Sequence, residues 1–295
     1  MDKQIPLDRS VEAELDDHHV VREIAPDIAY KRLVMVNVVY LGVPESGERQ
    51  WVLVDAGLHG SAAAIQKGAE RRFGAKVPPA AIIMTHGHFD HVGALETLAE
   101  RWDIPIFAHI RELPYLNGTE SYPPADPSVG GGMMAALSGL YPRGPIDVSG
   151  WLRPLPADGS VPFLPEWRWI HTPGHAPGHI SLWRESDRSM VVGDAFITTN
   201  QESAYAVATQ EPELHGPPKY FTPDWASARD SVQRLASLAP ELVVTGHGHA
   251  MHGPVMLNAL ERLAREFDRI AVPEHGRYVR TDARDGGRPE LPDSR

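Results

Sequence analysis

The sequence contains no cysteine, no long apolar run and no cluster of basic residues. Without cysteine, disulfides and thiolate metal ligands are both excluded, which fits a cytoplasmic protein. Nothing approaches the roughly 18 consecutive apolar residues that a membrane helix needs. The start of the chain, MDKQIPLDRSVEAELDDHH, is polar and acidic and lacks the apolar stretch of a secretory signal. We therefore expect a cytoplasmic protein without a membrane partner.

Positive charge is also scarce. Lysine and arginine number 28 against 39 aspartates and glutamates, which gives a formal net charge of −11. This charge repels phosphate backbones, so we expect no nucleic-acid partner. A small-molecule substrate is the expected partner, and the sequence predicts no particular oligomeric state.

The chain organisation indicates one domain. No glycine- or serine-rich linker and no repeat divides the 295 residues, so we predict a single domain over residues 1–273 and a carboxy-terminal tail over 274–295. Residues 112–160 are rich in glycine and proline around an apolar island, and we interpret them as a lid-like insert. Apolar runs predict strands and amphipathic runs predict helices. The strands are expected at 35–43, 51–57, 80–86, 105–110 and 241–248, and the helices at 60–74, 92–102, 224–239 and 254–268.

Histidine is plentiful where cysteine is missing. The chain has 15 histidines, and the segment THGHFDH follows directly after the apolar run AAIIM. If the chain is extended after that strand, the side chains of His86, His88 and Asp90 point the same way, and His91 begins the next helix. Imidazole and carboxylate are ligands that suit zinc and its first-row relatives. The segment therefore predicts a metal site.

Three further candidate ligands lie where predicted strands end. His175 lies in HTPGHAPGH, Asp194 in VVGDAF and His247 in VVTGHGH, and each has glycine close by. Glycine lets the backbone approach a metal closely, and strand ends at one sheet edge are common locations for sites. Spacing alone leaves open whether these loops meet.

Taken together, these motifs resemble the metallo-β-lactamase superfamily. The resemblance is carried by Asp55 in LVDAG, by THGHFDH, by His175 in TPGH, by Asp194 in GDA and by His247 in GHG. They occur in the order of that family and span most of the chain, from about residue 30 to 250. The resemblance implies an α/β fold, namely an αββα sandwich of two mixed β-sheets with helices on the outer faces.

The resemblance also implies a dinuclear metal site. It assigns a ligand set to each of two divalent ions, one bridging carboxylate, and one aspartate, Asp55, that supports the ligand loops. The ligands are His86, His88 and His175 for the first metal, Asp90, His91 and His247 for the second, and Asp194 as the bridge. Zinc is the expected metal, with iron or manganese as alternatives.

The implied activity is hydrolysis. A hydroxide that bridges the two metals would attack an ester or lactone carbonyl, and Asp90 would aim it as the catalytic residue. A thioester substrate, as in glyoxalase II-like relatives, and a phosphodiester are the hydrolytic alternatives. A mononuclear iron sulfur dioxygenase is the non-hydrolytic alternative, and the complete second ligand set disfavours it. A binding protein without catalytic activity would have a ligand position occupied by a residue that cannot bind metal, and no such position is found.

The expected substrate pocket involves the insert. Its apolar side chains could form a lid, while HTPGHAPGH and HFDHVG resemble the acyl-homoserine-lactone lactonases, whose tyrosine after the bridging aspartate is replaced here by Ile197. His249, just after the last ligand, could line the pocket or carry a proton. The candidate pocket residues are Met133, Met134, Leu137, Tyr141, Ile197 and His249.

Overall fold

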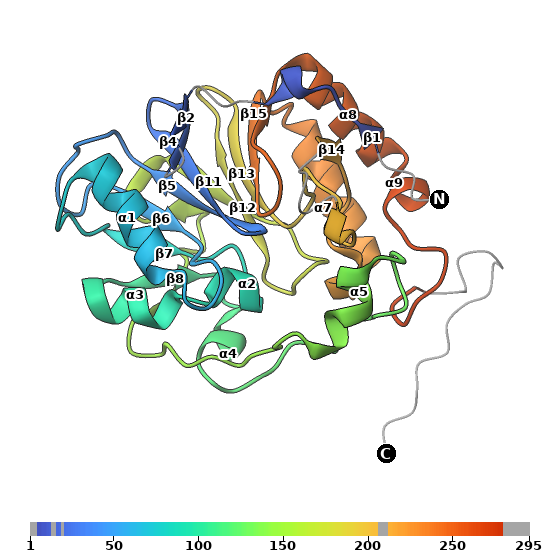
Figure 1. Ribbon diagram of the computed structural model, residues 1–295, viewed down its shortest axis with the longest axis horizontal. Helices are drawn as coiled ribbons and strands as arrows, with labels where there is room; N and C mark the ends of the chain where they lie inside the picture. The colour runs from blue at the N-terminus through green and yellow to red at the C-terminus, as the bar shows by residue number, and fades with distance from the viewer. Residues whose placement is uncertain (1–4, 13–15, 19–20, 206–211, 280–295) are drawn as a thin grey trace.

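The computed structural model describes residues 5–12, 16–18, 21–205 and 212–279 of the chain, shown in Figure 1. Two mixed β-sheets lie face to face and helices cover their outer faces. The αββα sandwich predicted from the sequence is confirmed.

The first sheet has eight strands in the order β2-β3-β4-β5-β6-β7-β8-β9. The pairs from β2 to β6 are antiparallel, and those from β6 to β9 are parallel. All six residues of β5 are buried, which explains why its sequence is apolar without alternation. The strands are β2 (Asp16–His18), β3 (Val21–Ala25), β4 (Ile28–Leu33), β5 (Val36–Leu41), β6 (Val52–Val54), β7 (Ala81–Ile83), β8 (Ile106–Ala108) and β9 (Leu152–Pro154).

The second sheet has six strands in the order β10-β11-β12-β13-β15-β16, all antiparallel except the pair β13 and β15. A small two-stranded sheet pairs β1 (Ile5–Pro6) with β14 (Glu213–Leu214). The six strands are β10 (Ser160–Val161), β11 (Leu164–His171), β12 (Ile180–Arg184), β13 (Ser189–Gly193), β15 (Leu242–Thr245) and β16 (Met251–His252).

The helices divide between the two outer faces. In Figure 1, α1 and α3 lie beside the first sheet, and α7 and α8 lie beside the second. Helix α7 begins after Asp224, whose carboxylate accepts a hydrogen bond of 3.0 Å from the N–H of Ser227. The helices are α1 (Ala62–Phe73), α2 (Phe89–Val92), α3 (Leu95–Trp102), α4 (Leu113–Leu116), α5 (Met133–Leu137), α7 (Trp225–Ser237), α8 (Gly253–Arg265) and α9 (Phe267–Ile270), with 3-10 turns at Arg9–Val11, Ser138–Leu140 and Lys219–Phe221. None of these helices combines the length and apolar character of a membrane span.

Three buried clusters fill the layers. The central one joins side chains of both sheets, among them Val54 and Ile83 from the first and Val191 and Val244 from the second. The other two lie between each sheet and its helices. Because the two sheets share a core, their loops at one edge are held at a fixed separation.

Residues 112–160 include α4, α5 and the strand β9, which extends the first sheet beside β8. Of the expected tail, residues 274–279 are described, and they pack against the insert. The N–H of Arg277 donates to the Asp126 carboxylate, and the Tyr278 hydroxyl donates to the Pro124 carbonyl at 2.6 Å. Residues 280–295 lie outside the described part of the chain. The division into domain, insert and tail stays a prediction.

A substitution of Trp51 tests the packing between the first sheet and its helices. Its fully buried ring stacks on Phe73 at 4.3 Å between centroids and meets Trp102 edge-on at 5.9 Å. We expect Trp51→Ala to lower the free energy of unfolding by about 3–5 kcal/mol, since it leaves a large cavity. Denaturant titration measures this change. The 81% exposed Leu140, changed to alanine, is the control and should stay within about 0.5 kcal/mol of the wild type. A loss below about 1 kcal/mol for Trp51→Ala would contradict this description of the core.

Candidate metal centre

Both sheets supply side chains to one edge of the sandwich. His86 and His88 lie in the loop after β7, where His88 is extended (φ −66°, ψ 155°). Asp90 and His91 belong to the short helix α2 that follows. The remaining three candidates come from the second sheet. His175 lies between β11 and β12, Asp194 directly follows β13, and His247 follows β15.

The structure brings all seven predicted ligands together. Three groups can each place ligand atoms within 4.8 Å of one another, and every member is buried. The groups are His86, His88 and His175; His86, His91 and Asp194; and Asp90, His91 and His247. The first and third groups are the two ligand sets that the family resemblance implies. Their role as ligands stays a prediction.

Asp194 stands between the two sets. Its Oδ2 lies 3.4 Å from His175 Nε2 and 3.1 Å from His247 Nε2. The same His247 nitrogen is 3.4 Å from Asp90 Oδ2, and His88 Nδ1 is 2.9 Å from His175 Nε2. The Asp194 carboxylate thus lies beside members of both sets, as the bridging role requires.

Three buried atoms at this place have no hydrogen-bond partner among the described residues: His86 Nε2, His91 Nε2 and Asp194 Oδ1. His91 Nε2 and Asp194 Oδ1 lie 3.6 Å from each other, too far for a hydrogen bond. An unsatisfied buried polar atom costs about 1–3 kcal/mol, so this group of atoms requires an explanation. Imidazole nitrogens and carboxylate oxygens are the donors that zinc and related divalent ions prefer. The residues present therefore fit two divalent cations.

Hydrogen bonds outside the cluster orient two of these rings. His247 Nδ1 lies 2.6 Å from the Met35 carbonyl oxygen and His175 Nδ1 lies 3.3 Å from Thr222 Oγ1. The Thr222 hydroxyl donates to the Pro218 carbonyl, so its oxygen is free to accept from His175. With the proton of each ring on Nδ1, the Nε2 lone pair faces the cluster.

Asp55 and His179 support the same centre from behind. The Asp55 carboxylate accepts from the backbone N–H of Thr85 (2.8 Å) and from its hydroxyl (2.7 Å), and lies 2.8 Å from His91 Nδ1. His179 Nε2 accepts the backbone N–H of Asp194 at 2.8 Å and is thus not available as a ligand. The contacts of Asp55 are those that a supporting residue needs, and the role itself stays a prediction.

The pKa values divide the histidines into two kinds. Burial lowers the pKa of His86, His88 and His175, that of His88 to about 3, and neighbouring histidines lower it further. Burial also acts to lower the pKa of His91, but Asp194 and Asp55 outweigh it and raise the pKa well above its usual value. The first three rings are therefore neutral, whereas Asp194 and Asp55 favour the protonated form of His91.

The candidate pocket residues are not gathered in one place. Met133 is 60% exposed and Leu137 is 44% exposed on α5. Tyr141 lies nearer the centre, with its ring 5.2 Å from that of Phe89, and its hydroxyl donates to the Met134 carbonyl.

The other two candidates lie away from α5. Ile197 is fully buried and pairs with His215. His249 lies with its two ring nitrogens 3.0 Å from Arg22 and 3.2 Å from Arg32. The pocket assignment stays a prediction.

A cleft that the sequence did not predict opens beside the first ligand set. Besides His88 and His175 it is lined by aromatic rings and prolines, namely Tyr122, Pro123, Pro124, Pro177, Phe221, Pro223 and Tyr278. The Phe221 ring stacks on His88 at 4.7 Å. Among the described residues that line this cleft, none is a lysine, arginine, aspartate or glutamate.

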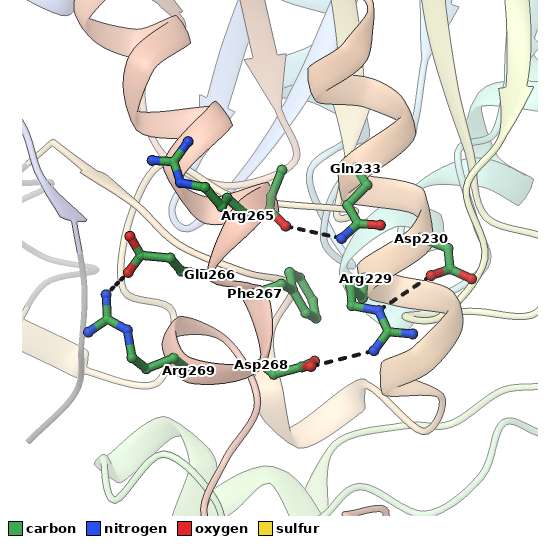
Figure 2. A pocket seen from close by; sticks show the side chains of 9 residues that line it. Arg229, Asp230, Gln233, Arg265, Glu266, Phe267, Asp268 and Arg269 are labelled. Atoms are coloured by element: carbon green, nitrogen blue, oxygen red, sulfur yellow. Dashed lines mark hydrogen bonds and ion pairs between the residues drawn. The ribbon is translucent and has the colours of Figure 1, made fainter. Parts of the chain in front are cut away.

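A second hollow lies at the surface between α7 and the α8–α9 corner, and Figure 2 shows its side chains. Most of its charges pair with one another: Arg229 with Asp230 and Asp268, and Arg269 with Glu266. Since these pairs satisfy one another and none of the seven candidate ligands lines this hollow, we do not assign the function to it.

Sequence reasoning also missed Glu112. This residue is fully buried next to the ligand loops, and burial raises its pKa to about 7 against the opposing effect of the donors from Tyr122, Gly178 and Gly87. Glu112 is a single glutamate after a strand, and no sequence motif around it indicates its contacts.

Comparison with known proteins agrees with this geometry. A family model described as the metallo-beta-lactamase superfamily matches residues 32–247. The chain is 50% identical over 236 residues to the probable metallo-hydrolase YflN of Bacillus subtilis (strain 168), covering 80% of this chain and 89% of the relative. It is 26% identical over 220 residues to a hydroxyacylglutathione hydrolase of Halorhodospira halophila, covering 72% of this chain and 62% of the other. Among solved structures, it is similar to TTHA1623 in a di-iron-bound form, at 25% identity and a TM-score of 0.53, covering 78% and 95% of the two chains.

Gly246 provides a test of the centre that leaves every ligand in place. A Cβ at this position would lie 2.0 Å from Asp194 Oδ1 and 2.9 Å from the His91 ring. We expect Gly246→Ala to push the Asp194 carboxylate aside and lower zinc affinity by at least about 10-fold. Zinc titration against a chromophoric chelator measures the affinity. Gly150→Ala is the control, because a Cβ there meets nothing within 4 Å, and it should bind zinc like the wild type. Unchanged zinc affinity in a folded Gly246→Ala protein would contradict the expected location of the metals.

Proposed function

The chain belongs to the metallo-β-lactamase superfamily, and we propose that it hydrolyses an ester or lactone at a centre of two divalent cations. Its likeness to the metallo-hydrolase of B. subtilis supports a metal-dependent hydrolase. The dinuclear site, its metal and its substrate class are the proposal.

The observation that carries the proposal is the arrangement of the two histidine and aspartate sets around Asp194. All seven side chains are buried, and three of their nitrogen and oxygen atoms have no hydrogen-bond partner within the described ranges. Neither set is broken by a non-ligand residue. A binding protein without catalysis has no need of two complete sets.

Two divalent cations, when bound, would polarise a carbonyl group and lower the pKa of a water molecule toward neutrality. The protein's own contribution is to hold the reactants. Asp194 would fix the separation of the two ligand sets, and Asp55 would fix the ring of His91. Asp90, 3.4 Å from His247, would accept a hydrogen bond from the attacking water and aim it at the carbonyl carbon.

The side chains beside His88 and His175 favour an acyl substrate. They are aromatic rings and prolines, which offer an apolar contact surface next to the first ligand set. No lysine or arginine lines this cleft to hold a phosphate in addition to the two cations. We therefore place ester or lactone hydrolysis ahead of phosphodiester hydrolysis.

Thioester hydrolysis is the second candidate, favoured by the likeness to a hydroxyacylglutathione hydrolase at 26% identity. For the metal, we propose zinc because the ligand set consists of nitrogen and oxygen donors. Iron is the alternative that the di-iron form of the similar structure favours.

One preparation can distinguish these possibilities. Metal content is quantified by elemental analysis, and the same sample is assayed with lactone, aryl-ester, thioester and phosphodiester substrates. We expect two zinc ions per chain and hydrolysis of an ester or lactone without oxygen uptake. One iron per chain with oxygen consumption would instead identify a sulfur dioxygenase and overturn the proposal.

Asp90→Asn tests the catalytic assignment. Asparagine keeps the size of the side chain but is a poor acceptor for the proton of the attacking water, so we expect kcat to fall by about 10²–10⁴-fold with little change in KM. The metal content of the variant must be measured alongside. Asp230→Asn, on the exposed surface of α7, is the matched control and should keep wild-type kcat. Near-normal turnover of Asp90→Asn with both metals bound would rule out this role.

A further inference from the structure

Glu112 is a buried carboxylate that belongs to neither ligand set. It lies between β8 and α4, at the start of the predicted insert, and no part of it is exposed. Burying a carboxylate is costly unless donors surround it, so its position calls for a reason.

The donors to Glu112 come from both ligand loops of the first set. Oε1 accepts the N–H of Gly178 at 2.7 Å, and Oε2 accepts the N–H of Gly87 at 3.0 Å. Gly87 lies between His86 and His88, and Gly178 lies three residues after His175. One carboxylate thus joins backbone segments that are 91 residues apart in the chain, each within three residues of a candidate ligand.

Tyr122 extends this connection to a ligand side chain. Its hydroxyl donates a short hydrogen bond to Glu112 Oε2. Its ring lies 4.4 Å from the His88 ring and stacks on Tyr115 at 3.9 Å. The ring of His88 is therefore held between Tyr122 on one side and Phe221 at 4.7 Å on another.

Two glycines permit this close packing. A Cβ on Gly178 would lie 2.8 Å from Glu112 Cγ, and a Cβ on Gly87 would lie 2.8 Å from the Tyr122 hydroxyl. Either contact would force the carboxylate or the tyrosine away. Glycine at both positions is what lets one carboxylate reach both backbones.

A direct catalytic role does not fit this geometry. Both oxygens of Glu112 already accept hydrogen bonds from the chain, and the residue does not line the cleft. It can act on the centre only through the loops that it joins.

We propose that Glu112 is a positioning residue that sets the separation of His88 and His175, with Tyr122 as its partner. The inference rests on the proposed function in one respect, namely that these histidines hold a metal. Residues around a ligand contribute to affinity by fixing its orientation, and their loss typically costs about 10–100-fold in metal affinity.

The test is Glu112→Gln, measured by zinc titration against a chromophoric chelator and by the visible absorption of the cobalt-substituted protein. Glutamine keeps the shape but turns one acceptor oxygen into a donor NH₂ that faces another donor. We expect affinity for one of the two ions to fall by about 10–100-fold and the cobalt bands to change. Tyr122→Phe, which keeps the ring and loses the hydroxyl, should give a smaller change in the same direction. Glu120→Gln, an exposed carboxylate in the same segment, should match the wild type.

A merely structural role predicts a different result. In that case Glu112→Gln lowers the melting temperatures of the metal-free and metal-loaded protein equally and leaves zinc affinity unchanged. Wild-type zinc affinity in this variant would overturn the inference, and if the variant does not fold, wild-type affinity in Tyr122→Phe would overturn it. If the wild-type chain itself bound no divalent ion, the proposed function would fail instead, so the two failures are distinguishable.

Discussion

The contacts of the Asp194 carboxylate are the interaction on which the rest of the centre depends. Histidines from both sheets converge on it: His91 from the first, and His175 and His247 from the second. Buried carboxylates and imidazoles are costly to gather in one place, and a bound cation would offset that cost. The two-sheet sandwich can be understood as the frame that holds these loops at the distance a shared carboxylate can span.

Much of the fold followed from local patterns. Strand β5 and helix α7 were predicted because their apolar spacing is unambiguous. The strands β3 and β4 were not, since sequences such as VREIA and IAYKRL mix charged and apolar residues without a regular period. Their strand conformation comes from pairing with β5. Tertiary pairing of this kind leaves little trace in a short segment.

The candidate site was predictable in a similarly uneven way. Its seven candidate ligands are histidines and aspartates at strand ends, and the structure brings all seven together. Glu112 and Thr222 could not be found, because their contacts to Gly178 and His175 join distant parts of the chain. The expectation for Ile197 rested on the resemblance to lactonases, and that for His249 on its position just after His247. Ile197 is fully buried and His249 lies 3.0 Å from Arg22, which the sequence does not indicate.

The cleft beside the first ligand set has a wall that comes from elsewhere in the chain. Tyr278 lines the cleft from the carboxy-terminal segment, and its hydroxyl donates to the Pro124 carbonyl. Neither residue is a candidate ligand. A change in that segment can therefore alter the wall of this cleft while the seven candidate ligands stay untouched. Proteins that share one fold and one set of ligand residues can in this way come to differ in the walls around the site.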